Sequence, residues 1–212
     1  MWLSVIVPTH NRVASLKRLL ESLDALECPD SVQVEFLVVD NDSTDQTASL
    51  LLKEQVKPRK CSFRVFQERR KGKASALNLG LTSANGDFIL VVDDDVVVHP
   101  RWLIQHLECY QTTTFDAVQG RVLPGVDPEG EPADPKRLRE YNIPIVDYGE
   151  EVCEIPGLTG TNMSFKREVF EKVGFFDTRL GPGASGFSED TEYSMRIREA
   201  GLKIGYSPYP IV

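Results

Sequence analysis

The stretch FILVVDDD at residues 88–95 places three consecutive carboxylates directly behind five apolar residues. The apolar run is typical of a buried strand, and VVV at residues 96–98 resumes it, so the acids interrupt a hydrophobic segment. In α/β proteins, ligands bind at the carboxyl ends of the strands. Adjacent carboxylates repel one another unless a cation or hydrogen-bond donors offset the repulsion, and oxygen ligands favour Mg²⁺ or Mn²⁺. The stretch therefore predicts a site for a metal-bound phosphate, with a solvated turn as the alternative.

Strand-like and helix-like segments alternate on both sides of this stretch. Repeated βα units with apolar strands predict an α/β fold, in which helices flank one mostly parallel sheet and the loops after the strands meet at one edge. Before the strand at 88–92 we expect a strand at 3–8, a helix with Val13, Leu16, Leu20 and Leu23 on one face, a strand at 34–39, a helix that opens at a capping box of Ser43 and Gln46, a strand at 63–66 and a helix at 73–84. After it we expect a strand at 158–165, a helix at 167–173 and a helix that opens at Ser188.

Composition limits the class of protein. The 212 residues, 41% of them hydrophobic, are enough for one sizeable core and predict a single domain. A formal net charge of -8 argues against general affinity for nucleic acid or anionic membranes, although the basic cluster at 69–73 can bind phosphate locally. The four cysteines show no zinc-type spacing, no leader is evident at Met1, and no apolar run approaches the roughly 20 residues of a membrane span. We expect a cytoplasmic protein with reduced thiols, which leaves a peripheral position at the inner face of the membrane open.

Two loops stand out by composition. Residues 124–135 are rich in Gly, Pro and acidic side chains and are predicted to form a mobile loop, and residues 181–186 form a Gly-rich loop. Trp102 follows Pro100 at the expected start of a helix, where core packing is favoured over stacking on a sugar.

Four motifs occur in a recognisable order: SVIVPTHNR at residues 4–12, VVDNDSTD at 38–45, DDD at 93–95 and SEDTE at 188–192. Their order and spacing resemble the family 2 glycosyltransferases over nearly the whole chain. The resemblance implies a GT-A type, Rossmann-like domain over residues 1–212, with a nucleotide-binding half at 1–98 and an acceptor-binding half at 99–212. It also implies transfer of a sugar from a nucleotide-sugar to an acceptor hydroxyl with inversion, in polysaccharide or glycan biosynthesis.

The resemblance implies which residues hold the nucleotide. A carboxylate at Asp40 can accept a hydrogen bond from the imide N–H of uracil and also from the donor edge of guanine, so a UDP-sugar is expected and GDP stays open. The alternative for Asp40 and Asp42 is a role at the start of the next helix. Lys73 and the backbone N–H groups around it could meet a diphosphate, or form a solvated basic turn. The expected nucleotide contacts are Pro8, Thr9, Asn11, Arg12, Asp40, Asp42, Lys73, Asp93 and Asp94.

The same resemblance assigns the metal and the base. Asp95 would bind Mn²⁺ or Mg²⁺ directly, and Asp93 would hold ribose or a metal-bound water; the ion would stabilise the leaving diphosphate. Asp190, beside Glu189, would take the proton of the acceptor hydroxyl in a single displacement. The alternative is that Glu189 and Asp190 only stabilise a helix start, with Ser188 as N-cap.

The expected sugar and acceptor contacts are Gly160, Thr161 and Asn162, which an ordinary core strand would also explain. The acceptor is expected to be a sugar or a glycolipid. The chain stops at Val212 without the later His of the family and without a Q-x-x-R-W segment, which predicts weakened metal binding and single transfer. A catalytically silent nucleotide-sugar-binding module stays an alternative. A sugar nucleotidyltransferase is less favoured, because no Gly-rich phosphate loop follows the first strand.

Overall fold

The structure is a computed structural model that describes residues 1–29, 31–125, 145–186 and 188–212. Most of the loop predicted at 124–135 lies outside these residues. Within the part of the chain that is described, none of the helices has the length and apolar character needed to cross a bilayer.

One eight-stranded sheet runs through the molecule, as the α/β prediction requires. In spatial order the strands are β3 (Ser62–Gln67), β2 (Gln33–Asp40), β1 (Trp2–Thr9), β4 (Phe88–Val92), β7 (Asn162–Lys166), β5 (Ala117–Arg121), β8 (Ile204–Ile211) and β6 (Cys153–Glu154). Strands β1, β2, β3 and β4 pair in parallel, whereas β7 is antiparallel to both β4 and β5, and β6 is antiparallel to β8.

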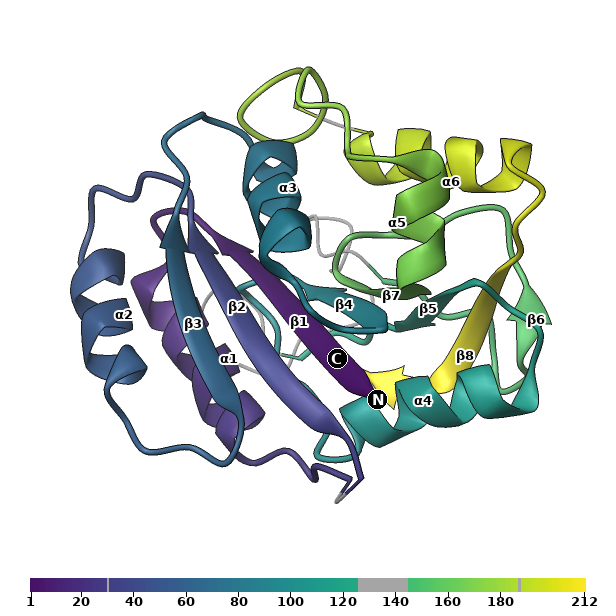
Figure 1. Ribbon diagram of the computed structural model, residues 1–212, viewed down its shortest axis with the longest axis horizontal. Coiled ribbons are helices and arrows are strands. Elements are labelled where there is room, and N and C mark those ends of the chain that lie inside the picture. Colours follow the sequence, from purple (N-terminus) through teal and green to yellow (C-terminus); the bar gives the residue numbers. More distant parts are fainter. Residues whose placement is uncertain (30, 126–144, 187) are drawn as a thin grey trace.

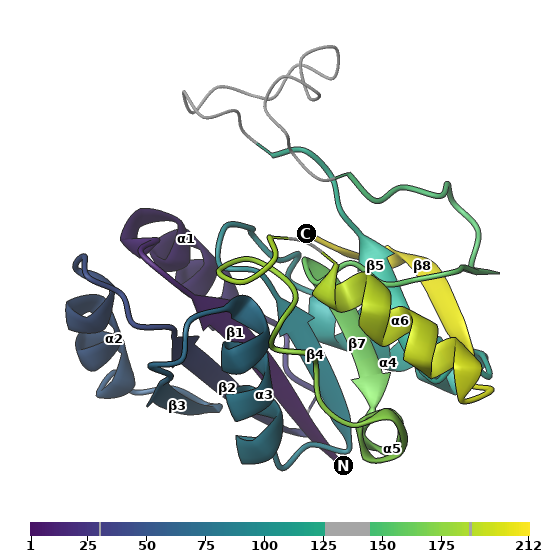
Figure 2. The ribbon, with the colours of Figure 1, turned by 90° about the horizontal axis from the view of Figure 1, so that it is seen from above.

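Helices cover both faces of the sheet (Figures 1 and 2). On one face α1 (Val13–Asp24), α2 (Thr47–Gln55) and α4 (Trp102–Thr112) bury apolar side chains such as Leu16, Leu51 and Trp102. On the other face α3 (Lys73–Ser83), α5 (Arg167–Val173) and α6 (Glu189–Glu199) bury side chains such as Leu77 and Tyr193. In α1 the 3.6-residue apolar spacing explains why Leu16, Leu19, Leu20 and Leu23 all face the sheet.

Several predicted elements are confirmed, among them β4 and α5 with their predicted bounds. The strand predicted at 158–165 begins only at Asn162, and residues 96–98 do not form a strand. Trp102 is fully buried, as expected for core packing.

The predicted capping box is wrong, because α2 begins at Thr47. Ser43 does not cap the helix: its Oγ accepts a hydrogen bond from the backbone N–H of Asn11 at 2.9 Å. The Asn11 side-chain carbonyl accepts the N–H groups of Thr44 and Asp45, which would otherwise lie in the first helical turn. The contact with the neighbouring loop therefore delays the start of the helix by three residues, from the predicted N-cap Ser43 to the observed N-cap Gln46.

Ser188 does occupy the N-cap position of α6, but it adopts a φ of 79° and its side chain makes no capping hydrogen bond. Glu189, Asp190 and Glu192 in the first turn supply the negative charge that the helix dipole favours.

Candidate functional site

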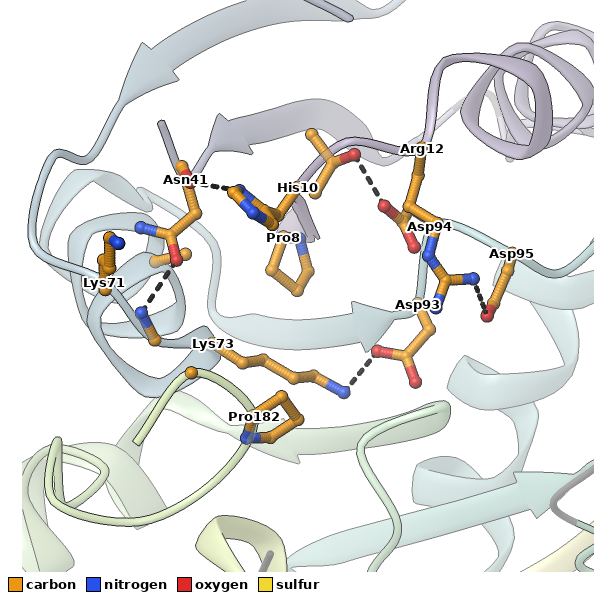
Figure 3. A pocket seen from close by; sticks show the side chains of 14 residues that line it. Pro8, His10, Arg12, Asn41, Lys71, Lys73, Asp93, Asp94, Asp95 and Pro182 are labelled. Carbon is orange, nitrogen blue, oxygen red and sulfur yellow. Dashed lines mark hydrogen bonds and ion pairs between the residues drawn. The ribbon is translucent and has the colours of Figure 1, made fainter. Parts of the chain in front are cut away.

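The carboxyl ends of β1, β2 and β4 meet at a pocket with a volume of about 370 Å³ (Figure 3). This size falls within the usual range for small-molecule sites. The loop after β1, the residue after β2, the start of α3, the acids after β4 and the Gly-rich loop at 181–186 each contribute to it. Its lining residues are Pro8, Thr9, His10, Arg12, Asn41, Lys71, Gly72, Lys73, Ala76, Asp93, Asp94, Asp95, Pro182 and Gly183.

Each of the three consecutive aspartates has its own partner. Asp93 pairs with the Lys73 ammonium and accepts a hydrogen bond from the Thr161 hydroxyl. Asp94 accepts a hydrogen bond from the Thr9 hydroxyl at 2.6 Å. Asp95 forms an ion pair with Arg12, with 2.7 Å between Nη1 and Oδ2. These separate partners offset the repulsion that three adjacent carboxylates would otherwise suffer.

Burial and nearby charges shift the pKa values of Asp94, Lys73 and Glu189. It raises the pKa of Asp94 to about 6, and the neighbouring Asp95 charge adds to the effect against the opposing hydrogen bond from Thr9. For Lys73, burial lowers the pKa, but the carboxylates of Asp93, Glu189 and Asp190 together outweigh burial, so the net pKa is raised and the ammonium stays charged. Burial likewise raises the pKa of Glu189, against the nearby Lys73 charge.

Lys73 lies at the junction of several site elements. Its ammonium points at Asp93 (Figure 3) and lies near the charges of Glu189 and Asp190. Its backbone N–H donates to the carbonyl of Pro182 at 3.0 Å. The prediction that this N–H is free for a diphosphate is therefore wrong, whereas the ammonium does line the pocket.

The oxygen donors of Asp93 and Asp95 suit Mg²⁺ or Mn²⁺. Within the described residues, no group of three or more His, Cys, Asp or Glu side chains is arranged to hold a metal ion alone. One or two carboxylates, completed by phosphate oxygens and water, match the usual coordination of Mg²⁺ at nucleotide sites. The residues present therefore fit an ion that is shared with a bound diphosphate.

Three of the predicted nucleotide contacts do not line the pocket. Asp40 is buried at the end of β2, where its Oδ1 accepts the N–H of Ser43 at 3.1 Å. Its Oδ2 has no hydrogen bond among the described residues. Asp42 is exposed and has a φ of 60°. Asn11 bridges the two loops, with its side-chain carbonyl 2.7 Å from the N–H of Thr44, and its structural task is to join them.

The predicted base lies beside the pocket and is not part of its lining. Asp190 Oδ2 accepts the N–H of Gly160 at 3.1 Å, and Oδ1 accepts that of Thr191 at 2.7 Å. A Cβ added to Gly160 would lie 3.0 Å from the Lys73 ammonium. Gly160, which has no side chain, thus lies between Asp190 and the Lys73 ammonium.

Asn162 does not face the pocket, contrary to its predicted contact with sugar hydroxyls. Its side chain is fully buried, and Nδ2 donates to the carbonyls of Arg121 and Pro210. Its Oδ1 accepts from Trp102 Nε1 at 2.8 Å and lies 3.1 Å from His106 Nε2. Both the amide nitrogen and the amide oxygen of Asn162 are therefore used within the core. Thr161 is also buried but reaches the site indirectly, through its bond to Asp93.

Two residues that line the pocket, His10 and Asn41, were not predicted from the sequence, whereas Lys71 belongs to the basic cluster at 69–73 that was expected to bind phosphate. Asn41 holds the loop before α3: its Oδ1 accepts the N–H of Gly72, and its Nδ2 donates to the carbonyls of Glu68 and Arg70. His10 Nδ1 lies 2.7 Å from the carbonyl of Asn41. Both residues stand inside the motifs already singled out, so their place in those motifs was the available signal.

Comparisons with known proteins agree with this architecture. A sequence model described as Glycosyl transferase family 2 matches residues 4–174. The chain is 26% identical to the Probable glycosyltransferase YdaM of Bacillus subtilis, over 98% of this chain and 49% of that protein. It is 27% identical to the Pre-mycofactocin glycosyltransferase of Mycobacterium tuberculosis, over 99% of this chain and 42% of that protein. The chain thus spans about half the length of these curated relatives.

Solved structures share the fold. The mannosyltransferase PcManGT from Pyrobaculum calidifontis, in complex with GDP-Man and Mn²⁺, superposes with a TM-score of 0.73 at 24% identity, over 99% of this chain and 55% of that one. S. aureus TarS in complex with UDP gives a TM-score of 0.75 at 23% identity, over 100% of this chain and 60% of that one. At these identities the likeness establishes the GT-A fold alone. The family match over residues 4–174, on a sheet with this fold and this pocket, shows that the chain belongs to glycosyl transferase family 2, a family of transferase enzymes.

Proposed function

We propose that this chain is an inverting glycosyltransferase domain that moves a sugar from a UDP-sugar to an acceptor hydroxyl in glycan or polysaccharide biosynthesis. The observation that carries the proposal is the convergence of Asp93, Asp94 and Asp95 with Lys73 and Arg12 around one pocket at the carboxyl ends of β1, β2 and β4. Carboxylates for a cation and cations for phosphates lie within one pocket, which suits a metal-bound nucleoside diphosphate.

Uridine is the proposed base because of Asp40, which does not line the pocket itself but ends β2 directly before Asn41, a lining residue. Its Oδ2, without a hydrogen bond among the described residues, can accept the imide N–H of uracil. The solved TarS structures with UDP and with UDP-GlcNAc support this choice. Guanine is the second candidate, since its donor edge also suits a carboxylate and PcManGT was solved with GDP-Man. Pro8 and Thr9 would lie against the nucleoside, and Asp42 would contact it from the loop that follows β2.

Asp95 would hold the divalent ion, with Asp93 beside it. The ion would be Mn²⁺ or Mg²⁺, and structures of PcManGT and GalNAc-T7 with Mn²⁺ support the assignment. When bound, the ion would stabilise the negative charge that develops on the leaving diphosphate. Lys73, whose charge is secured by Asp93, would add a cation on the same side of the pocket.

Asp190 would remove the proton from the acceptor hydroxyl. Its two backbone hydrogen bonds, from Gly160 and Thr191, hold the carboxylate in place and leave lone pairs for that hydroxyl. The absence of a side chain at Gly160 leaves room next to the Lys73 ammonium. Direct attack on the side opposite the leaving diphosphate would invert the anomeric carbon. Glu189, buried at the preceding position of α6, would position it.

The acceptor would be a sugar or a glycolipid. The names of two relatives refer to undecaprenyl carriers: an undecaprenyl-phosphate arabinose-type transferase at 33% identity over 44% of this chain, and a PP-undecaprenol glucosyltransferase at 33% identity over the same share. A protein that acts on such carriers would work in the cytoplasm, at the inner face of the membrane.

Calorimetry with UDP and GDP, with and without Mn²⁺, tests the donor site on the wild type and on Asp95→Asn. We expect UDP to bind more tightly than GDP, and binding to weaken at least ten-fold when either Mn²⁺ or Asp95 is removed. Equal binding in the variant would overturn the assignment of Asp95.

Transfer is tested separately with Asp190→Asn, screened against UDP-sugars and glycolipid acceptors. The variant should bind UDP as the wild type does and lose at least 100-fold in turnover, the usual scale for loss of a general base. Donor binding without turnover in the wild type would instead identify a silent nucleotide-sugar-binding module.

A further inference from the structure

Two cysteines meet at the end of the sheet opposite the pocket. Cys28 lies in the segment between α1 and β2, and Cys61 directly precedes β3. Their sulfur atoms are 3.2 Å apart although the residues are 33 positions apart in the sequence. Both side chains are partly buried, so a small oxidant can reach them. A disulfide requires about 2 Å between the sulfurs, so they would need to approach by only about 1 Å.

Independent contacts keep these two segments together. Asp24, at the end of α1, pairs with Lys57 at 2.6 Å and with Arg59 at 2.7 Å, and both partners belong to the segment between α2 and β3. The Arg59 side chain is 7% exposed, and its guanidinium carbon lies 4.3 Å from the ring centroid of Phe63. These contacts hold the segment after α1 next to the segment before β3, and so keep the two thiols close together.

We propose that Cys28 and Cys61 form an oxidisable dithiol that closes to a disulfide when a peroxide reaches it. The bond would join the segment before β2 to the segment before the edge strand β3, and it would leave the pocket at the other end of the strands untouched.

The two thiols have different roles in this step. Burial, together with Cys28, raises the pKa of Cys61 to about 12, so Cys61 stays protonated at neutral pH. Cys28 is then the sulfur that hydrogen peroxide oxidises to a sulfenic acid, with release of one water. The Cys61 sulfur next attacks Cys28, the S–O bond breaks, and the hydroxyl leaves with the Cys61 proton as a second water. Two thiols and one peroxide thus give one disulfide and two waters.

Intact-mass measurement after treatment with hydrogen peroxide tests the proposal on the whole chain. We expect a loss of about 2 Da, reversed by dithiothreitol, and a proteolytic peptide that links Cys28 to Cys61. The melting temperature should rise by about 5 °C or more in the oxidised protein, because a cross-link restricts the unfolded chain.

Matched variants separate this pair from the other thiols. Cys28→Ser and Cys61→Ser should each abolish the mass loss, whereas Cys153→Ser, which removes another partly buried thiol, should leave it unchanged. The proposal is overturned if peroxide leaves all four thiols free, produces only sulfinic acid at Cys28, or links either cysteine to Cys153 or Cys109.

Discussion

Protonation of His106 should destabilise the fold at mildly acid pH. The ring is fully buried between Asn162 and Ser164, with Nε2 3.1 Å from Asn162 Oδ1 and Nδ1 2.9 Å from Ser164 Oγ. Asn162 Nδ2 donates to two carbonyls, so its Oδ1 is an acceptor and His106 Nε2 must carry the hydrogen. Nδ1 then accepts from Ser164, whose oxygen can accept from Tyr110. The network is complete with a neutral imidazole.

The magnitude follows from the pKa difference. Burial lowers the pKa of His106 from 6.5 to about 4, so the folded protein binds fewer protons than the unfolded chain in this interval. The free energy of unfolding therefore falls as the pH drops, and the effect is confined to the interval between these two values. The full loss is about 3 kcal/mol, of which about 2 kcal/mol falls between pH 7 and pH 5.

Urea unfolding at pH 7, 6 and 5 measures this loss in the wild type and in His106→Gln. Glutamine stays neutral and can still donate to Asn162 and accept from Ser164. Other groups titrate in both proteins and cancel in the difference; Asp94, with its pKa raised to about 6, acts in the opposite direction. The wild type should lose about 2 kcal/mol more than the variant between pH 7 and pH 5. Parallel pH profiles would refute the reasoning.

Three further predictions concern single contacts. Arg12 and a divalent ion are alternative partners of Asp95, and both side chains of the pair are about half exposed. Arg12→Gln should therefore tighten Mn²⁺ binding in the absence of nucleotide by only about two-fold to five-fold, as measured by electron paramagnetic resonance. Weaker Mn²⁺ binding in the variant would contradict the competition. Asn162→Ala should lower the free energy of unfolding by about 3 kcal/mol or more, because it leaves buried donors and acceptors unpaired; a loss below about 1 kcal/mol would contradict this. Gly181→Ala should cost more stability than the matched Gly149→Ala: both glycines have positive φ, but only at Gly181 would the new Cβ lie 2.7 Å from a Glu189 oxygen, and equal losses would show that this contact yields freely.

The local sequence pattern was sufficient to predict the bounds of a segment where residues nearby in the sequence decide its structure. The bounds of β4 and α5 follow from an uninterrupted apolar run and from helical spacing, which few tertiary contacts override. The start of α2 could not be predicted, because Asn11 binds the N–H groups that a capping box would have used. A GTN tripeptide likewise cannot reveal that the Asn162 amide lies between Trp102 and His106.

In the candidate site, too, some residues could be predicted from the sequence and others could not. The predicted acids after β4 and the loop after β1 do lie together, because the carboxyl ends of neighbouring parallel strands share one edge of the sheet. The contribution of Pro182 and Gly183 could not be predicted, since their contact with Gly72 joins segments more than a hundred residues apart.

That contact between the Gly-rich loop and the start of α3 has a consequence for how relatives diverge. Pro182 and Gly183 form one wall of the pocket, yet they lie beyond residues 4–174, the part of the chain that the family model matches. Two proteins can therefore match the family equally well and still differ in this wall. Exchange of the 181–186 loop between relatives would change the pocket while leaving the sequence that identifies the family intact, which makes the loop a natural place to alter what the pocket binds.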